Sequence, residues 1–205
     1  MKLFVLGATG HTGNQIIDIA LARSHEVTAF VRSPEKVRRR HSRLKIVCGD
    51  PRNLDQLTKE LPGHDAVLSA LGVRPPQAFR PHRLVEDCAA STVAAMANAR
   101  VSRLLVVSAA VLFPEKGILF AVFRRLLKHI ARDLKAAEEI VRDTSLEWTI
   151  ARPPRLTNGS NADYRAVRNA LPAKGFSMSF RGVAAFMLDS VEQRTHLREV
   201  VGLAS

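Results

Sequence analysis

Three glycines near the start of the chain have the spacing that phosphate-binding turns require. Gly7, Gly10 and Gly13 follow the apolar run at residues 3–6 and precede a segment with helical periodicity. Gly7 would let the chain turn sharply off a strand, Gly10 would let the backbone approach a pyrophosphate, and Gly13 would let the new helix pack closely. The N–H groups at the start of that helix would then face the phosphates. The pattern predicts a dinucleotide-binding turn, and the alternative is a glycine-rich turn without a ligand.

Two basic residues come directly after the second predicted strand, at residues 26–31. In dinucleotide folds that prefer NAD, the end of this strand carries an Asp or Glu that binds the ribose hydroxyls, but here Arg32 stands there and Lys36 follows. A guanidinium can bind a 2′-phosphate through two parallel hydrogen bonds. These residues therefore predict NADP as the cofactor, and the alternative for Arg32 is a solvated surface arginine.

Small and polar residues end the later predicted strands. Leu71 and Gly72 follow the strand at 66–70, Ser108 follows the strand at 104–107, and Pro153 follows the strand at 147–152. Because parallel strands end at the same edge of a sheet, these residues are expected to lie together. We interpret Ser108 as the candidate catalytic residue beside the nicotinamide or the acceptor. The alternative is a serine that caps local backbone.

Strands and helices alternate along the whole chain. The predicted helices lie at 11–23, from Ser33-Pro34 onward, at 53–61, at 83–99, at 118–134 with a resumption through 142, and at 181–191. Asn53 and Gln56 form a candidate capping box for the helix at 53–61. Further strands lie at 45–48 and, as an edge strand, at 199–203. This order predicts an α/β fold with a Rossmann-type, doubly wound parallel sheet in three layers. The 205 residues, 46% of them hydrophobic, suit a single domain over 1–205 whose C-terminal part builds the substrate pocket.

The net charge of +12 is unusual, but its pattern does not favour nucleic acid as a partner. Basic residues cluster at 38–43 and 124–128 without interleaved aromatics or a helix-turn-helix pattern, so an anionic cofactor accounts for part of the charge. Neither a signal peptide nor a membrane span is visible, so we expect a cytoplasmic protein. Cys48 and Cys88 lack metal or redox spacing and are interpreted as small buried residues, and no metal site is predicted.

Residues 118–134 form a basic amphipathic pattern, with an apolar stripe opposite arginines and lysines. Such a helix can lie on a membrane surface or cover a pocket. Its position between two strands favours a pocket cover.

Several segments together resemble a known family. The segments at 7–13, 31–32, 49–50, 69–72, 107–109, 148–154 and 183–188 are similar to the atypical short-chain dehydrogenase/reductases with an NAD(P)H-binding domain, in particular the biliverdin IX-beta/flavin reductase and NmrA-like groups. The resemblance implies that the pyrophosphate is wrapped by Thr9, Gly10, His11 and Thr12, and that the 2′-phosphate is held by Arg32 and Lys36. It also implies that Asp50 lies beside the adenine and that Leu71 and Gly72 line the ribose and pyrophosphate. The nicotinamide and substrate would be bordered by Ser108, Ala109, Pro153 and Pro154.

The chain departs from that family at two places. An arginine, Arg155, stands after Pro-Pro where the flavin reductases have a histidine, which weakens the case for a tetrapyrrole substrate. The Tyr-x-x-x-Lys pair of ordinary short-chain dehydrogenases is missing, because Ala131 stands four residues before Lys135 and the only tyrosine is Tyr164.

These observations favour an NADPH-dependent reductase that transfers a hydride to flavins or similar conjugated acceptors. The alternative is a non-catalytic NADP(H)-binding redox sensor of the NmrA-like type that acts through a protein partner. An open apolar pocket beside the nicotinamide, roofed by the helix at 118–134, would favour the reductase, and a filled pocket would favour the sensor. An epimerase or dehydratase of nucleotide sugars is disfavoured, since those enzymes need the missing tyrosine and a longer chain.

Overall fold

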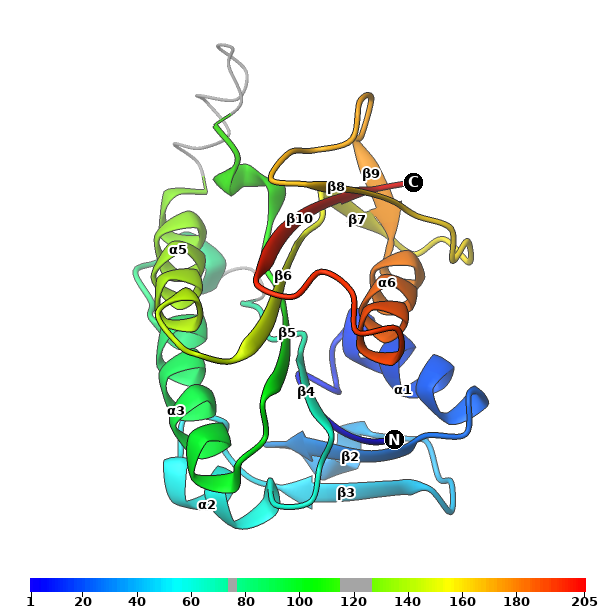
Figure 1. Cartoon of the computed structure of the whole chain (residues 1–205), viewed down its shortest axis with the longest axis vertical. Coiled ribbons are helices and arrows are strands. Elements are labelled where there is room, and N and C mark those ends of the chain that lie inside the picture. The colour runs from blue at the N-terminus through cyan, green and yellow to red at the C-terminus, as the bar shows by residue number, and fades with distance from the viewer. Residues whose placement is uncertain (74–76, 115–126) are drawn as a thin grey trace.

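An eight-stranded sheet with helices on both faces forms the body of the protein in a computed structural model, which describes residues 1–73, 77–114 and 127–205 (Figure 1). The strands, in their order across the sheet, are β3 (Leu44–Cys48), β2 (Glu26–Val31), β1 (Lys2–Leu6), β4 (Ala66–Ser69), β5 (Arg103–Val107), β6 (Glu147–Arg152), β10 (Glu199–Ala204) and β8 (Arg165–Arg168). All neighbouring pairs are parallel except β10 and β8. The predicted Rossmann-type doubly wound sheet is confirmed.

The helices form a layer on each face of the sheet. They are α1 (His11–Ala22), α2 (Leu54–Glu60), α3 (Leu84–Ala99), α5 (Lys128–Arg142) and α6 (Phe180–Glu192). In Figure 1, α1 and α6 lie together on one side of the sheet, and α2, α3 and α5 lie on the other. The strand order reverses between β1 and β4, and in such sheets ligands bind at the carboxyl ends of the strands beside this reversal.

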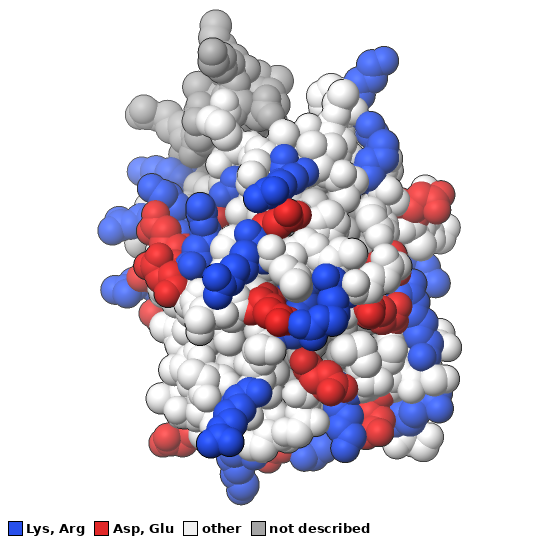
Figure 2. Space-filling view, viewed as in Figure 1, with Lys and Arg blue, Asp and Glu red and all other residues white. Residues whose placement is uncertain are grey.

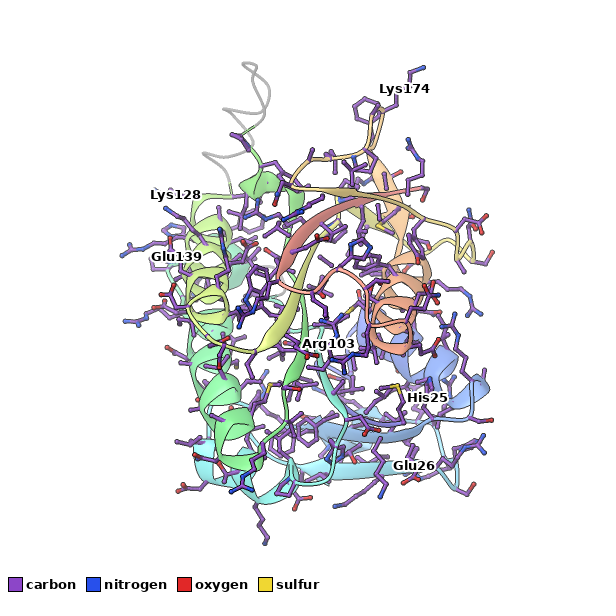
Figure 3. All side chains as sticks on the ribbon, in the orientation of Figure 1. His25, Glu26, Arg103, Lys128, Glu139 and Lys174 are labelled. Carbon is purple, nitrogen blue, oxygen red and sulfur yellow. The ribbon has the colours of Figure 1, made fainter. Side chains whose placement is uncertain are left out.

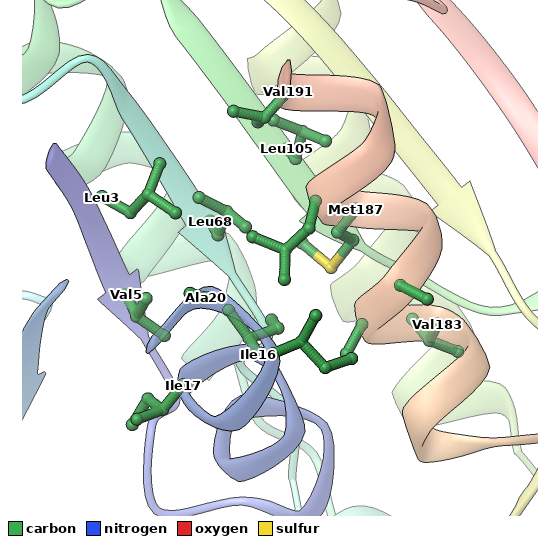
Figure 4. Close-up of a cluster of buried hydrophobic side chains, with 14 of the residues drawn as sticks. Leu3, Val5, Ile16, Ile17, Ala20, Leu68, Leu105, Val183, Met187 and Val191 are labelled. Atoms are coloured by element: carbon green, nitrogen blue, oxygen red, sulfur yellow. The ribbon is translucent and has the colours of Figure 1, made fainter. Parts of the chain in front are cut away.

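The central strands are apolar on both faces because each face is covered by a helix layer. On β1, Leu3 and Val5 belong to the cluster that packs against α1 and α6, drawn in Figure 4. Phe4 and Leu6 alternate with them and belong to the cluster on the α2, α3 and α5 side. All four side chains are buried, so the apolar run that precedes Gly7 is a core strand.

The structure differs from the sequence predictions at the last strand. We predicted the strand at 199–203 as an edge strand, but β10 lies inside the sheet because β8 pairs with its outer side in antiparallel orientation. β8 escaped prediction because it is short and largely exposed, and it carries Arg165 and Arg168 instead of an apolar pattern. Charged side chains on such an edge discourage pairing with another chain. A separate two-stranded sheet, β7 (Arg155–Thr157) with β9 (Ser177–Ser179), was also not predicted.

Three smaller expectations also change. The helix predicted from Ser33-Pro34 is a single 3₁₀ turn, Pro34–Lys36. Cys48 is exposed and not buried, because it ends the outermost strand β3, whereas Cys88 is buried as expected. Of the amphipathic segment predicted at 118–134, only the part from residue 127 onward is described, and there α5 begins at Lys128.

Charge is distributed over the surface without a dominant stripe on the face that Figure 2 shows. There, Lys and Arg side chains are interspersed with Asp and Glu side chains among the described residues. In the same part of the chain, no helix is long and apolar enough to cross a membrane, and no group of three or more His, Cys, Asp or Glu side chains has the arrangement of a metal site.

Candidate functional site

The glycine turn joins β1 to α1 at the carboxyl edge of the sheet. Gly7 has a φ of +77°, and a Cβ on it would lie 2.4 Å from the Ala70 carbonyl oxygen, so only glycine fits this turn beside the end of β4. A Cβ on Gly13 would lie 2.2 Å from the Gly7 carbonyl oxygen. The sharp turn predicted at Gly7 and the close helix packing predicted at Gly13 are therefore both present.

Gly10 differs from these two glycines. Among the described residues, a Cβ on Gly10 would closely approach only the Gly7 carbonyl oxygen, at 3.2 Å, which is a tight contact but less severe than those at Gly7 and Gly13. Gly10 is also the N-cap of α1, and no side chain caps the helix there. The first-turn N–H groups of a helix without a side-chain cap suit an anionic ligand. Thr12 is buried in this turn, and the exposed His11 ring stacks on Phe180, with 4.8 Å between the ring centroids.

A cavity of about 270 Å³ opens directly at this turn. It is lined by Gly7, Thr9, Gly10, Phe30, Val31, Arg32, Ser33, Lys36, Pro51, Ala70, Leu71, Gly72, Val73 and Leu84. The lining thus combines the turn after β1, the end of β2 and the end of β4. It brings together seven of the residues predicted to bind the cofactor, namely Gly7, Thr9, Gly10, Arg32, Lys36, Leu71 and Gly72.

One wall of this cavity is positively charged. Arg32 and Lys36 lie on it, and within the described residues neither forms an ion pair with a carboxylate. A second hollow of about 400 Å³ is lined by Asn14, Lys36, Arg38 and Arg39. Of these cations, Arg39 is paired with Asp18. The remaining positive charge is available to a phosphate at the end of the cavity next to β2.

Asp50, predicted beside the adenine, lies next to the cavity, but its carboxylate is already bound by an arginine. Its carboxylate accepts hydrogen bonds from Nε and Nη2 of the Arg52 guanidinium, the shortest being 2.6 Å, and this contact lowers the pKa of Asp50. Pro51 lines the cavity in its place. The predicted cap of α2 is half present. Asn53 Oδ1 accepts the Gln56 N–H at 3.0 Å, while the Gln56 side chain accepts the Asp50 N–H instead of closing the capping box.

The second half of the predicted site lies where β5 and β6 end side by side. The Ser108 N–H donates to the Ala151 carbonyl at 2.8 Å, and the Ala110 N–H donates to the Pro153 carbonyl at 2.8 Å. These two bonds hold the Ser108-Ala109 segment against the Pro153-Pro154 segment. The structure thus brings together the four residues predicted to border the nicotinamide and substrate, although none of them lines the cavity itself.

The Ser108 side chain belongs to a buried polar cluster that the sequence did not reveal. Its hydroxyl donates to Glu138 Oε1 at 2.5 Å, and Glu138 is paired with Arg152, with 2.6 Å between Arg152 Nη2 and Glu138 Oε2. The Arg152 guanidinium also donates to the Leu112 carbonyl at 3.2 Å and lies 4.8 Å from the centroid of the Phe113 ring. Arg152 is therefore neutralised by a carboxylate. The signal that was missed is Glu138 itself, which stands on the apolar stripe of α5, four residues after Leu134.

A second buried carboxylate on α5 positions α3. Asp133 accepts the N–H groups of Val85 and Glu86, both at 3.0 Å, and so caps the start of α3 from another helix. His82 Nε2 lies 3.3 Å from the same carboxylate. This contact fixes Leu84, which lines the cavity. Sequence reasoning missed Asp133 because the two N–H groups that it accepts lie 47 and 48 residues away.

The remaining face of α5 is apolar where it meets the site. Leu134 and Ala137 form a small cluster with Val85, against which Ala109 and Ile130 pack. Tyr164 lies on the other side of the sheet, where its hydroxyl donates to Asp189 of α6 at 2.7 Å and burial raises its pKa to about 12. No tyrosine of the described residues therefore stands beside Ser108.

Comparison with known proteins agrees with this geometry. The sequence profile of the NAD(P)H-binding family matches residues 7–194. An uncharacterized Bacillus subtilis protein, YwnB, is 26% identical over 213 residues, which cover 97% of this chain and 96% of the relative. The narrower resemblance to the biliverdin IX-beta/flavin reductase and NmrA-like groups stays a prediction.

Solved structures share the fold over the whole chain. The oxidoreductase ylbE from Lactococcus lactis has a TM-score of 0.85 at 22% identity, with 100% of this chain and 91% of that chain covered. A short-chain dehydrogenase/reductase from Veillonella parvula DSM 2008, solved in complex with NADP, has a TM-score of 0.82 at 19% identity, with 100% and 94% covered. The family profile extends from the first glycine of the turn to the end of the last helix, so this chain belongs to the NAD(P)H-binding family.

Proposed function

We propose that the protein is an NADPH-dependent reductase that delivers a hydride to planar conjugated acceptors such as flavins or quinones. The observation that carries this proposal is the apolar contact surface between α5 and Ala109, where the buried Leu134 and Ala137 and the partly buried Ile130 pack. A reductase of simple ketones needs a proton donor next to the reacting carbon. No described side chain of this surface can supply that proton.

The cavity at the glycine turn fits a dinucleotide with a 2′-phosphate. The N–H groups at the start of α1 suit the pyrophosphate, and Gly72, which also lines the cavity, has open space where a Cβ would stand. Arg32 and Lys36 would bind the 2′-phosphate, since neither forms a direct ion pair with a carboxylate among the described residues. The oxidoreductase and NADP named for the two structural neighbours support the same assignment.

When bound, a nicotinamide dinucleotide supplies the hydride, and the protein must orient the acceptor and exclude competing reactions. Hydride addition to a ketone leaves a strongly basic alkoxide, which does not persist without a donor. Addition to a flavin or quinone leaves a delocalised anion that water protonates later. Arg155, exposed at the start of β7 and without a carboxylate partner in the described structure, can stabilise that anion. Arg152 is less suited, because Glu138 neutralises it.

Turnover measurements test this assignment. NADPH consumption should be observed with a free flavin or a quinone and should be negligible with a simple ketone. Tyr164→Phe serves as the control variant and should leave flavin turnover unchanged, because Tyr164 lies on the α6 side of the sheet. Brisk ketone reduction that Tyr164→Phe abolishes would contradict the proposal. Tight NADPH binding without turnover of any acceptor would instead support the redox-sensor alternative.

A further inference from the structure

The buried cluster around Glu138 determines which way the Ser108 hydroxyl can point. A serine hydroxyl has one proton to donate and two lone pairs that accept. In the structure the proton is directed to Glu138 Oε1, with 2.5 Å between the two oxygens. Ser108 itself is buried, so water does not compete freely for this bond. What Ser108 Oγ has left to offer a ligand is its lone pairs.

Glu138 is held in the orientation that this contact requires. Arg152 donates from Nε to Oε1 at 2.9 Å and from Nη2 to Oε2 at 2.6 Å. The Glu138 side chain is 4% exposed, and its charge is balanced only by Arg152 among the described residues. A buried, bidentate pair of this kind has one favoured geometry, because rotating the carboxylate would break two charge-assisted bonds.

Arg152 is in turn fixed to the segment that follows Ser108. Its guanidinium donates to the Leu112 carbonyl and lies over the Phe113 ring. The pair therefore holds both the side chain of Ser108 and the backbone four residues later. This arrangement fixes the loop after β5 relative to the Ser108 Oγ atom.

We propose that Glu138, held by Arg152, is a positioning residue that makes Ser108 Oγ a hydrogen-bond acceptor for an N–H group of the bound ligand. The inference rests on the proposed function, because it assumes that the dinucleotide and acceptor meet at the ends of β5 and β6. Two ligand groups have this chemistry: the carboxamide NH₂ of the nicotinamide, and a ring N–H of a flavin-like acceptor. In either case Ser108 does not act as the proton donor of the reaction.

Calorimetric binding of two cofactors tests whether Ser108 Oγ accepts a hydrogen bond from the nicotinamide carboxamide. NADPH carries a carboxamide whose NH₂ can donate a hydrogen bond. In its 3-acetylpyridine analogue an acetyl group replaces the carboxamide, and the methyl group in place of the NH₂ cannot donate. We expect Ser108→Ala and Glu138→Gln each to weaken NADPH binding about 3- to 10-fold, the value of one hydrogen bond. The double variant should lose no more than the weaker-binding single variant, because Glu138 acts through Ser108. Binding of the analogue should be equal in all four proteins.

The second ligand group gives a different result. If the N–H belongs to the acceptor, NADPH binding stays constant while the KM for a flavin rises about 3- to 10-fold in both variants. The KM for a quinone, which has no N–H group, should then stay unchanged. Glu138→Asp carries the same tests should Glu138→Gln fail to fold, since it keeps both charges of the pair while shortening the reach to Ser108.

Several results would overturn the inference. Additive losses in the double variant, or equal weakening of NADPH and its analogue together with equal KM changes for flavin and quinone, would mean that Glu138 acts only on the fold. Unchanged binding and KM in Ser108→Ala would exclude Ser108 as the acceptor. Failure of the wild-type protein to bind NADPH at all would overturn the proposed function as well, and so the two failures are distinguishable.

Discussion

Two arginines, one buried and one partly buried, stand at opposite ends of the strands of the same sheet, and they are held in different ways. Arg103 is the first residue of β5, near the centre of the view in Figure 3, and among the described residues its guanidinium donates only to uncharged oxygens. The acceptors are the carbonyls of Glu147, Ser190 and Thr195 and the hydroxyl of Thr149, at 2.7–3.1 Å. Arg152, the last residue of β6, has a carboxylate partner in Glu138.

The difference separates the part of the molecule that holds the fold from the part that builds the site. Burial without a paired carboxylate lowers the pKa of Arg103 to about 10, which means that burial disfavours the charged form of its guanidinium. The hydrogen bonds of the Arg103 side chain connect the end of α6 and the turn before β10 to the sheet. Arg152 instead forms half of a neutral pair whose other half holds Ser108. The amino edge of the sheet thus carries structural polar contacts, and the carboxyl edge carries contacts that orient a candidate functional group.

The largest effect is expected at Arg103. Arg103→Met keeps the apolar stem but leaves several buried acceptors without a donor, which should cost about 3–5 kcal/mol of unfolding free energy. For a chain of this size, thermal unfolding should occur roughly 10 °C lower. Calorimetric NADPH binding below the unfolding temperature should be unchanged. A variant that keeps its stability but loses NADPH binding would contradict the assignment of the amino edge to the fold.

The loss of stability on replacing Arg152 should be recoverable, because its charged partner Glu138 can be replaced as well. Arg152→Met strands the buried Glu138 charge and should cost about 3 kcal/mol. Adding Glu138→Gln removes that charge and should recover most of the loss. Chemical denaturation of the two variants and the wild type measures this recovery. If the double variant is no more stable than Arg152→Met, the two residues are not an isolated pair and the contrast with Arg103 fails.

Glycines at the carboxyl edge offer a finer test with a smaller effect. Among the described residues, no atom lies within 4 Å of a Cβ on Gly72, so Gly72→Ala should change stability by less than about 0.5 kcal/mol. The same methyl group would face the cavity and should weaken NADPH binding measured by calorimetry. Gly13→Ala is the matched control, because its Cβ would meet backbone and should lower stability by about 2–3 kcal/mol. Unchanged NADPH affinity in Gly72→Ala would exclude a close approach of the dinucleotide there.

Local patterns predicted most of the fold and the cavity. The glycine spacing, the apolar strand at β1 and Arg32 after β2 are contiguous in sequence, and each has a direct physical meaning that needs no tertiary contact. β8 was missed because its pairing with β10 joins residues far apart, and its exposed Arg-Ala-Val-Arg sequence has no apolar alternation to reveal a strand.

The polar cluster at the site could not be predicted for a related reason. Ser108 and Glu138 are 30 residues apart, and nothing in the sequence states that α5 turns Glu138 toward the end of β5. The position of Arg152 at the end of a predicted strand likewise does not reveal that its partner is a carboxylate on α5. A charged residue on an apolar helix stripe is the signal that could have identified Glu138 in advance.

Titration of NADPH and NADH by calorimetry tests the central claim most directly. We expect NADPH to bind about 10- to 100-fold more tightly than NADH, because Arg32 and Lys36 line the part of the cavity where we propose that the 2′-phosphate binds. Arg32→Ala should remove about tenfold of NADPH affinity while leaving NADH binding unchanged. Arg142→Ala, an equal charge change at an exposed position at the end of α5, should affect neither cofactor. Equal affinities of the wild-type protein for both cofactors, or no change in Arg32→Ala, would contradict the account.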